Sequence, residues 1–376
     1  MEKLISKFYI TTFISEFART VPHPILIILL IDQKGLNLSQ ITFIQIFFYL
    51  GVLLFEVPSG YLADKGYRKS GYIGSYVCML LAYSLIFMSA NVAVLSFAWF
   101  IYGIAAALMS GNLDGYIVNL LKQNDSHHKI KSFNVNKTNI SLVAGIAGAL
   151  CGSLLYPLIK TNIYVISIVL YTLAIIVAVF GIRIKHVPTE QKALKIADLE
   201  FTTKIKTLIV LVCIIELYYV GFYQYWQVLY ELKGIPTQTF GIIYIVFSVT
   251  AILSNKLYAK LGKVNDYIII PVFIVTALTS LFVFESLIFC LIYPATLFIA
   301  NLYVMDIYTN LYENVDEASI SSMLSIVSTA NRIFGIAILA TLTIMINYFD
   351  LALILACLYL IFSLSFVIIR PRIKIN

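Results

Sequence analysis

The chain has 376 residues, of which 61% are hydrophobic and only 12% are charged, and its mean hydropathy is +0.93. Soluble domains are close to half apolar and a quarter charged, so this composition excludes an ordinary soluble enzyme or binding domain. The formal net charge of +7 would suit a nucleic-acid partner. The positions of the basic residues, described below, give a different explanation.

Long apolar runs recur along the whole chain. A helix needs about 20 predominantly apolar residues to cross the hydrocarbon core of a bilayer. The runs are continuous, whereas the strands of a membrane barrel alternate in polarity. We therefore predict an all-α polytopic membrane protein with twelve transmembrane helices. Their approximate limits are 8–31, 39–62, 71–89, 92–121, 134–158, 162–183, 205–230, 238–260, 267–284, 287–311, 319–345 and 350–370.

The basic residues predict the orientation of these helices. An even number of spans puts both termini on one side, and 21 of the 26 lysines and arginines lie on that side. Only Lys34, Lys160 and Lys233 lie on the other side. Because cytoplasmic loops are enriched in Lys and Arg, we expect both termini to be cytoplasmic. The excess positive charge then marks orientation, and we expect no nucleic-acid partner.

The longest connection divides six spans from six. We predict an N-terminal six-helix bundle over residues 1–184, a cytoplasmic linker over 185–204 and a C-terminal six-helix bundle over 205–376. A weak repeat supports the division, because the first span ends in LIDQKG at Gly35 and the seventh ends in LYELKG at Gly234. Two related halves are common in secondary transporters.

Residues 60–69, after the second span, read GYLADKGYRK. This segment resembles the signature G-x-L-A-D-[RK]-x-G-R-[RK] of the major facilitator superfamily, with one residue missing between the acid and the arginine. The resemblance implies two pseudo-symmetric six-helix bundles and a transporter rather than an enzyme. It also implies a cytoplasmic gate made of Glu56, Gly60, Asp64, Gly66, Arg68 and Lys69.

Each residue of this motif has a physical reading. We expect Gly60 to let two helices pack closely and Gly66 to permit the tight reversal of a short loop. Asp64 can pair with a basic group or a helix terminus, while Arg68 and Lys69 anchor the cytoplasmic face. The alternative is a solvated basic loop that only sets orientation.

Two features of proton-driven family members are absent. The position four residues before Gly103 holds Trp99 instead of an arginine, and no proline follows a glycine in the fifth span. Gly145, Gly148 and Gly152 provide close packing in that span. These departures weaken an assignment to drug–proton antiport by resemblance alone.

The first span contains ionisable residues, which are costly in a membrane and therefore point to function. Glu16, Arg19 and His23 lie on one helical face, and Pro22 and Pro24 are expected to kink or unwind the helix just beyond the arginine. One reading is a proton-sensitive carboxylate tuned by an arginine. The other is a structural Glu16–Arg19 pair.

The seventh span, its partner in the repeat, carries Glu216 near the depth of Glu16. We predict a cavity role for Glu216. Tyr219, Tyr223, Trp226 and Gln227 extend its face, and such aromatic residues with polar tips suit amphipathic or cationic ligands. An interfacial aromatic belt is the alternative for Trp226.

Helices one, four, seven and ten line the central cavity of the family that the chain resembles. The fourth and tenth spans are accordingly predicted to add polar residues to the cavity. These are Asn112, Asp114, Asn119, Asn301, Tyr303, Asp306 and Tyr308. Asp306 lies nearer the cytoplasmic end, where a gate or surface role is open. Arg332, in the eleventh span, has no acid beside it in sequence, so its partner is another helix or an anionic substrate.

We predict a secondary transporter that works by alternating access and exports amphipathic or cationic small molecules against protons. Coupling is assigned to protonation of Glu16, Asp114 or Glu216. The closest alternative is uptake of a small anionic or polar metabolite bound by Arg19, His23 and Arg332. A membrane receptor or scaffold that does not transport is a third possibility.

No P-loop, nucleotide-binding module or catalytic triad is present, and adjacent His127 and His128 lack further metal ligands. We therefore expect no cofactor and no metal. The expected partners are a small-molecule substrate, protons and the lipid bilayer, with the chain as a monomer. The abundance of Ile, Lys, Asn and Tyr suits an AT-rich bacterial genome and hence the bacterial cytoplasmic membrane.

Overall fold

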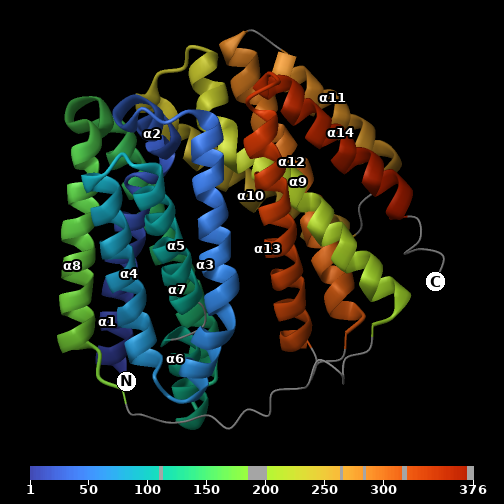
Figure 1. Ribbon diagram of the computed structural model, residues 1–376. Helices are drawn as coiled ribbons and strands as arrows, with labels where there is room; N and C mark the ends of the chain where they lie inside the picture. The colour runs from blue at the N-terminus through green and yellow to red at the C-terminus, as the bar shows by residue number, and fades with distance from the viewer. Residues whose placement is uncertain (110–112, 185–200, 263–265, 283–284, 316–319, 371–376) are drawn as a thin grey trace. The chain divides into compact units, whose positions relative to one another are not determined.

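The computed structural model describes residues 1–109, 113–184, 201–262, 266–282, 285–315 and 320–370, and the regular secondary structure in these ranges is helical (Figure 1). The chain divides into two compact units. Unit 1 comprises Met1–Gln191 and Pro236–Tyr244, and unit 2 comprises Lys192–Ile235 and Ile245–Asn376.

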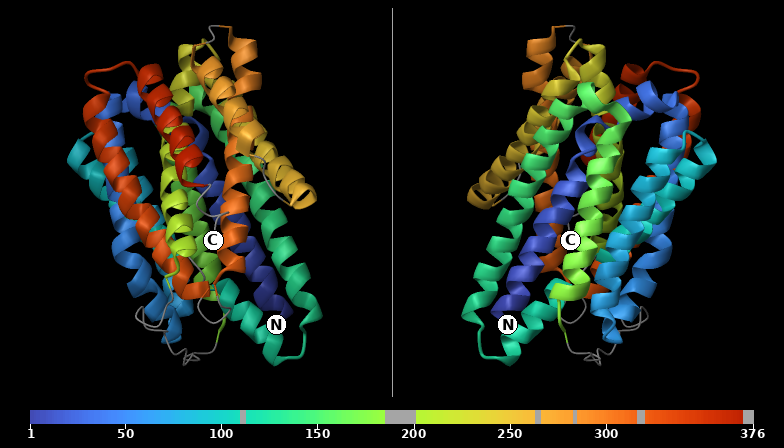
Figure 2. Two further views of the ribbon diagram at one scale, coloured as in Figure 1. Left: turned by 90° about the vertical axis from the view of Figure 1, so that its right-hand side faces the viewer. Right: turned by 90° about the vertical axis from the view of Figure 1, so that its left-hand side faces the viewer.

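The described residues of unit 1 form eight complete α-helices, the turns between them and the first residues of α10. α1 packs against α7 and α8, α4 packs against α5 and α8, and α3 packs against α5. The right-hand view of Figure 2 shows α8 with α1 and α4 on either side of it. The helices are α1 (Glu2–Thr20), α2 (Leu26–Lys34), α3 (Leu38–Asp64), α4 (Arg68–Met88), α5 (Val92–Met109), α6 (Leu113–Gln123), α7 (His128–Ile159) and α8 (Ile163–Gly181).

Unit 2 contains the remaining helices. α9 packs against α12, α13 and α14, and α11 packs against α12 and α14. The helices are α9 (Thr203–Leu232), α10 (Phe240–Leu261), α11 (Asp266–Phe282), α12 (Ser286–Glu313), α13 (Ile320–Met345) and α14 (Leu351–Ile369). The first residues of α10 belong to unit 1, and the remainder of α10 belongs to unit 2.

Ten helical segments of the described residues are long and apolar enough to cross a membrane, compared with the twelve predicted. One of the ten, His128–Gly181, is a 54-residue segment in which the short 3₁₀ turn η2 (Lys160–Asn162) joins α7 to α8. The predicted ninth span corresponds to a shorter apolar helix, Ile269–Phe282. The chain is thus a multi-pass helical membrane protein.

The predicted break in the first span is confirmed. α1 ends at Thr20, and a 3₁₀ turn, η1 (His23–Ile25), separates it from α2. Proline has no N–H, so Pro22 leaves the carbonyl of Ala18 without its helical donor. Ser167 of α8 donates its hydroxyl to that carbonyl at 2.7 Å.

Glycines of α7 allow this break to lie directly against the helix. A methyl group at Gly148 would lie 2.7 Å from the carbonyl oxygen of Phe17, and one at Gly152 would overlap the carbonyl of Val21. Small residues permit such close approach of membrane helices. The packing role predicted for these two glycines is confirmed.

The predicted repeat has a structural counterpart in each unit. Gly35 and Gly234, which end LIDQKG and LYELKG, adopt left-handed backbone conformations with φ of 67° and 73°. The lysine before each glycine donates to a carbonyl near the end of another helix of its own unit. Lys34 Nζ lies 2.8 Å from the carbonyl oxygen of Phe87, and Lys233 Nζ lies 3.5 Å from that of Leu281.

Candidate functional site

The central polar feature of unit 1 is an ion pair on α1. Arg19 donates to Glu16 Oε2 from Nη2 at 2.6 Å and from Nε at 3.1 Å. The two side chains are one helical turn apart and remain 38% and 27% exposed. The sequence left open a structural Glu16–Arg19 pair or a proton-coupling carboxylate. The ion pair is present, and its partly exposed geometry is also compatible with a coupling role.

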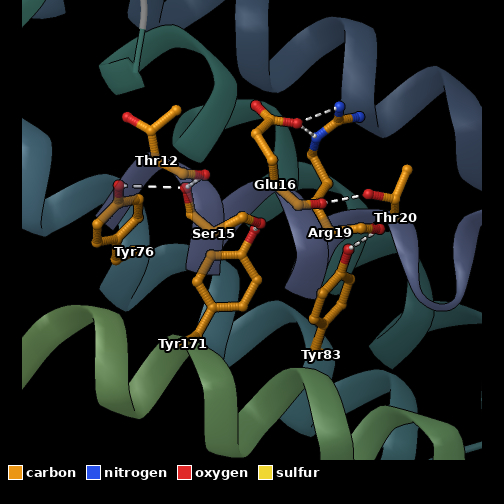
Figure 3. A network of polar contacts seen from close by, with 8 residues as sticks. All are labelled: Thr12, Ser15, Glu16, Arg19, Thr20, Tyr76, Tyr83 and Tyr171. Carbon is orange, nitrogen blue, oxygen red and sulfur yellow. Dashed lines mark hydrogen bonds and ion pairs between the residues drawn. The ribbon is translucent and has the colours of Figure 1, made fainter. Parts of the chain in front are cut away.

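Hydroxyl groups from neighbouring helices hold the backbone beneath this pair. Figure 3 shows Glu16 and Arg19 on one side of α1, while tyrosines reach its backbone from the other side. Tyr83 of α4 donates to the carbonyl of Arg19, and Tyr171 of α8 donates to that of Ser15, both at 3.2 Å. α4 and α8 therefore fix the position of the ion pair.

The sequence analysis does not identify these tyrosines as site residues. Tyr76 of α4 donates to Ser15 Oγ at 3.2 Å, and it precedes Tyr83 by seven residues, which is two helical turns. That spacing was the available signal for a hydroxyl-bearing face. Such a face is also typical of ordinary helix packing, so the spacing alone did not identify a site.

His23 lies at the break after α1. Its ring makes an edge contact with the ring of Tyr244, with the two centroids 5.4 Å apart. Tyr244 is among the first residues of α10, which belong to the same unit. The structure thus places an aromatic neighbour beside the predicted histidine.

The residues predicted on the fourth span are separated. Asp114, at the start of α6, forms an ion pair with Lys137 of α7, a partner that the sequence did not suggest. Asn119 is exposed, and Asn112 lies outside the described residues. Lys137 lies near the start of the predicted fifth span, 134–158, among the basic residues that predict orientation, and no sequence signal linked it to Asp114.

The predicted gate motif forms the turn between α3 and α4. Gly66 has φ +89°, as the tight reversal required. Arg68 is only 8% exposed, and its Nε lies 3.3 Å from the carbonyl oxygen of Ala63. Lys69 Nζ donates to the carbonyl of Val179, near the end of α8, at 2.9 Å. Asp64 is exposed, and Glu56 is half-buried.

The close helix approach expected at Gly60 is not found. Apart from the neighbouring residues and backbone of α3 itself, no atom of the described residues lies within 4 Å of the position that a Cβ would take there. α3 instead crosses α5 at Gly51 and Gly103, where an added methyl group would overlap the backbone of the opposite helix. Gly60 comes after this crossing, towards the end of α3, which explains the difference.

In unit 2, Glu216 of α9 lies inside the bundle and is 7% exposed. It accepts a hydrogen bond of 3.0 Å from Asn331 Nδ2 of α13. Tyr308 of α12 interacts electrostatically with both Glu216 and Arg332. The structure therefore brings four polar residues from three helices together, and Asn331 is the one that the sequence missed.

A pair of tyrosines extends this cluster along α9. The rings of Tyr219 and Tyr223 stack with centroids 5.8 Å apart and an interplanar angle of 18°. The hydroxyl of Tyr219 donates to Asn301 Oδ1 of α12 at 2.5 Å. Two amide groups, those of Asn301 and Asn331, thus flank the glutamate and the tyrosines.

Each of these amides has a buried polar atom without a hydrogen-bond partner among the described residues. The atoms are Asn301 Nδ2, a donor, and Asn331 Oδ1, an acceptor. Buried polar groups are nearly always satisfied in native proteins, so exceptions need an explanation. A ligand that offers one acceptor and one donor would satisfy both. We refer to Glu216, Tyr219, Tyr223, Asn301, Tyr308, Asn331 and Arg332 as the α9–α13 cluster.

The remaining predicted residues of α9 lie in an aromatic interior. Trp226 is 1% exposed and makes an edge contact with Phe247 at 5.2 Å. Tyr230 lies next to it, with ring centroids 6.0 Å apart. Gln227 is also buried. Trp226 and Gln227 therefore lie inside unit 2, whereas an interfacial aromatic belt would require Trp226 on its surface.

Asp306 and Tyr303 of α12 belong to a second polar group. Arg370, which follows α14, donates from Nη2 to Asp306 Oδ2 at 2.7 Å, and its guanidinium lies 5.0 Å from the ring centre of Tyr303. Both charged residues are buried. Arg370 had been counted with the basic residues that set orientation, so its partner was not foreseen.

The fold of the chain is shared with solved transporters. The POT family transporter PepTSo matches with a TM-score of 0.76 and 11% identity, over 100% of this chain and 99% of that one. The nucleoside transporter NupG matches with a TM-score of 0.75 and 11% identity, over 98% and 99% of the two chains. A bacterial homologue of the iron transporter ferroportin in the inward-facing state gives 0.74 and 12%, over 98% of each chain. At these identities the likeness concerns the fold alone.

No curated protein sequence matches the chain. The sequence profile described as Major Facilitator Superfamily matches residues 8–340. The match covers most of the chain and includes both units. The resemblance seen in the GYLADKGYRK segment is therefore confirmed over residues 8–340. The chain belongs to the major facilitator superfamily, and it is a multi-pass secondary transporter rather than an enzyme.

Proposed function

We propose that this transporter exports amphipathic, cationic small molecules in exchange for protons, by alternating access. The observation that carries the proposal is the α9–α13 cluster. It combines a buried carboxylate, two stacked tyrosines and two amides with unsatisfied buried atoms. A cation would be attracted by the carboxylate and by the aromatic faces.

Glu216 is the residue that we assign to proton coupling in unit 2. Its donor Asn331 is a neutral amide, which can also accept a hydrogen bond through its oxygen. The amide can therefore serve the carboxylate and, after rotation, the protonated acid. A buried acid with such a partner can release its proton when a cationic substrate binds and regain it when the substrate leaves.

Glu16 and Asp114 complete the proposed set of coupling acids. Each has a basic partner in the structure, Arg19 and Lys137 respectively. Protonation of either acid would break its ion pair and leave the basic partner without a counter-charge. Both pairs can therefore respond to a proton gradient. We assign them smaller contributions than Glu216, because both ion pairs are partly exposed and solvent screens their charges.

The test uses purified protein in proteoliposomes with ethidium as a fluorescent cationic probe. Glu216→Gln should abolish transport driven by an imposed pH gradient, because the amide does not titrate. Ethidium counterflow should be weakened but not lost, because the stacked tyrosines still bind the cation after the negative charge is removed. Glu16→Gln and Asp114→Asn should reduce gradient-driven transport less. Glu285→Gln, an exposed acid that caps α12, is the matched control and should behave like the unaltered protein. Full gradient-driven transport by Glu216→Gln would refute the coupling assignment.

We further propose twelve spans, with both termini in the cytoplasm of a bacterial cell, two six-helix bundles over 1–184 and 205–376, and a monomeric chain. The 54-residue segment that contains two helices and the shorter apolar helix Ile269–Phe282 support this count. Single cysteines at Asp125 and Asp350, introduced after replacing the five native ones, should label from opposite sides of intact cells. Labelling of both positions from the same side would refute the topology.

Uptake of a small anionic or polar metabolite is the second candidate. Arg19 and Arg332 provide guanidinium groups within helical spans, and the fold is shared with proteins described as peptide and nucleoside transporters. Transport direction separates the candidates, since accumulation in inside-out vesicles under a proton gradient indicates export. A receptor or scaffold would bind ligand saturably but show no counterflow.

A further inference from the structure

A basic cavity lies in unit 1, outside the proposed transport site, where the start of α1 meets the end of α8. Its volume is about 730 Å³. The right-hand view of Figure 2 shows the N-terminal end of α1 beside this end of α8. The residues that line the cavity come from both helices and from the chain just after α8. They are Met1, Glu2, Lys3, Leu4, Ser6, Lys7, Phe180, Gly181 and Arg183.

Three cations line this cavity. Lys3 and Lys7 are four residues apart on α1, so they share one face, and Arg183 comes from the other wall. Like charges at this helical spacing repel each other. None of the three has an ion-pair or hydrogen-bond partner for its charged group within the ranges that the structure describes. An anion between them would relieve the repulsion.

The single acid of the lining does not neutralise the cavity. Glu2 lies 3.9 Å from Lys129, at the start of α7, and 89% of its side chain is exposed. Its charge is therefore shared with a lysine outside the cavity. The aliphatic part of Lys7 packs next to Gly181, which holds the lysine at the end of α8.

The arginine at the corresponding position of unit 2 has a different environment from Arg183. Arg183 and Arg370 each follow the last helix of a unit, α8 and α14 respectively. Arg370 is buried in an ion pair with Asp306. Arg183 is exposed and lines the cavity. The comparison indicates that the cation after α8 is not required for internal packing.

An exposed apolar stripe leads along α8 into the cavity. Its members are spaced by three or four residues, and their exposed fractions lie between 41% and 77%. They are Val165, Val169, Leu173, Ile176 and Phe180. At about 1.5 Å per residue the stripe is about 22 Å long, which is most of one hydrocarbon core. A basic pocket at the end of an apolar stripe matches the two parts of a lipid.

We infer that the cavity binds the phosphate-bearing headgroup of an anionic phospholipid, with an acyl chain along the α8 stripe. Lys3, Lys7 and Arg183 contact the phosphate, and Phe180 contacts the start of the chain. Basic pockets between membrane helices are suited to anionic headgroups. A soluble phosphate compound would use the same cations but would leave the stripe unused, so the lipid is the occupant that accounts for both features.

The test is native mass spectrometry of the delipidated full-length protein, titrated with phosphatidylglycerol or with phosphatidylcholine of the same chains. We expect phosphatidylglycerol to bind more tightly. The triple variant Lys3→Gln, Lys7→Gln and Arg183→Gln should lose this preference, with a decrease in apparent affinity of about tenfold or more, since each cation contributes about fivefold. Lys204→Gln, Lys206→Gln and Lys256→Gln, which remove three charges from unit 2, should keep it.

A single variant and a competition experiment test the lipid site further. Arg183→Gln alone changes one exposed side chain, and it should lower the affinity for phosphatidylglycerol while leaving that for phosphatidylcholine unchanged. Glycerol 3-phosphate should not displace the lipid at equal concentration. Equal losses in both triple variants, or displacement by glycerol 3-phosphate, would overturn the assignment. The readout is binding, so the outcome does not depend on the direction or coupling of transport.

Discussion

The two units hold the charges of their helical spans in different ways. In unit 1, Glu16 and Arg19 pair within α1, one helical turn apart. In unit 2, Glu216 of α9 bonds to Asn331 of α13, and Asp306 of α12 pairs with Arg370 after α14. A pair within one helix survives any movement of that helix. A pair between helices exists only while both helices keep their packing. The buried pairs of unit 2 therefore respond to rearrangement, as does the partly exposed Asp114–Lys137 pair of unit 1, whereas the Glu16–Arg19 pair does not.

This difference predicts that substitution of Arg370 has the largest effect on stability. Its removal leaves Asp306 buried without its cation, and breaking one side of a buried pair costs about 3–5 kcal/mol. Arg370→Met should therefore lower the thermal unfolding midpoint of the detergent-purified protein strongly. Asp306→Leu combined with Arg370→Met should recover most of the loss, because no buried charge remains. A double variant as unstable as the single one would contradict this account.

The second effect concerns the close packing of unit 1 around the break in its first span. A methyl group at Gly152 would overlap the carbonyl of Val21, whereas one at Gly60 meets no described atom within 4 Å. Gly152→Ala should destabilise the protein by about 1–3 kcal/mol, the usual range for overpacking. Gly60→Ala is the matched control and should change the unfolding midpoint little. Equal midpoints for the two variants would show that α1 and α7 separate at low cost.

The third effect concerns the left-handed glycine that follows the lysine in each unit. Gly35 and Gly234 have left-handed conformations with open space around them, so only backbone strain opposes a side chain. Gly35→Ala and Gly234→Ala should each cost about 1 kcal/mol, from the penalty for an L-residue in this region. Thermal unfolding should show two similar shifts. A shift confined to one variant would contradict the structural repeat.

The smallest effect is expected for the pair of unit 1. Because Glu16 and Arg19 are partly exposed, their interaction contributes about 1 kcal/mol or less to stability. Glu16→Gln should shift the unfolding midpoint far less than Arg370→Met. A comparable shift would mean that the pair is a structural element of unit 1, and its assignment to coupling would lose its basis.

Features that depend on local sequence were predictable. The helical spans follow from apolar length, the break after α1 follows from two prolines, and the Glu16–Arg19 pair follows from helical spacing. The family was visible in ten residues, 60–69, because glycines and charges are rare enough in this chain to make a pattern specific.

Contacts between helices were not predictable. Glu216 was identified as a cavity residue, but its partner Asn331 is 115 positions away, and nothing in the sequence linked the two. Lys137 and Arg370 belong to the basic residues that predict orientation, yet each pairs with an acid that the sequence predicts in the cavity. A single sequence specifies the chemical type of a side chain and its helical face, but not which distant face it meets.

The sequence by itself determined that this protein is a multi-pass helical membrane protein, because apolar length acts locally and recurs along the chain. The tertiary structure decided which acids have partners, where helices touch at glycine, and which arginine is buried and which faces a cavity. Those outcomes depend on helix packing, and packing is set by the fit of many side chains at once rather than by any short run of residues.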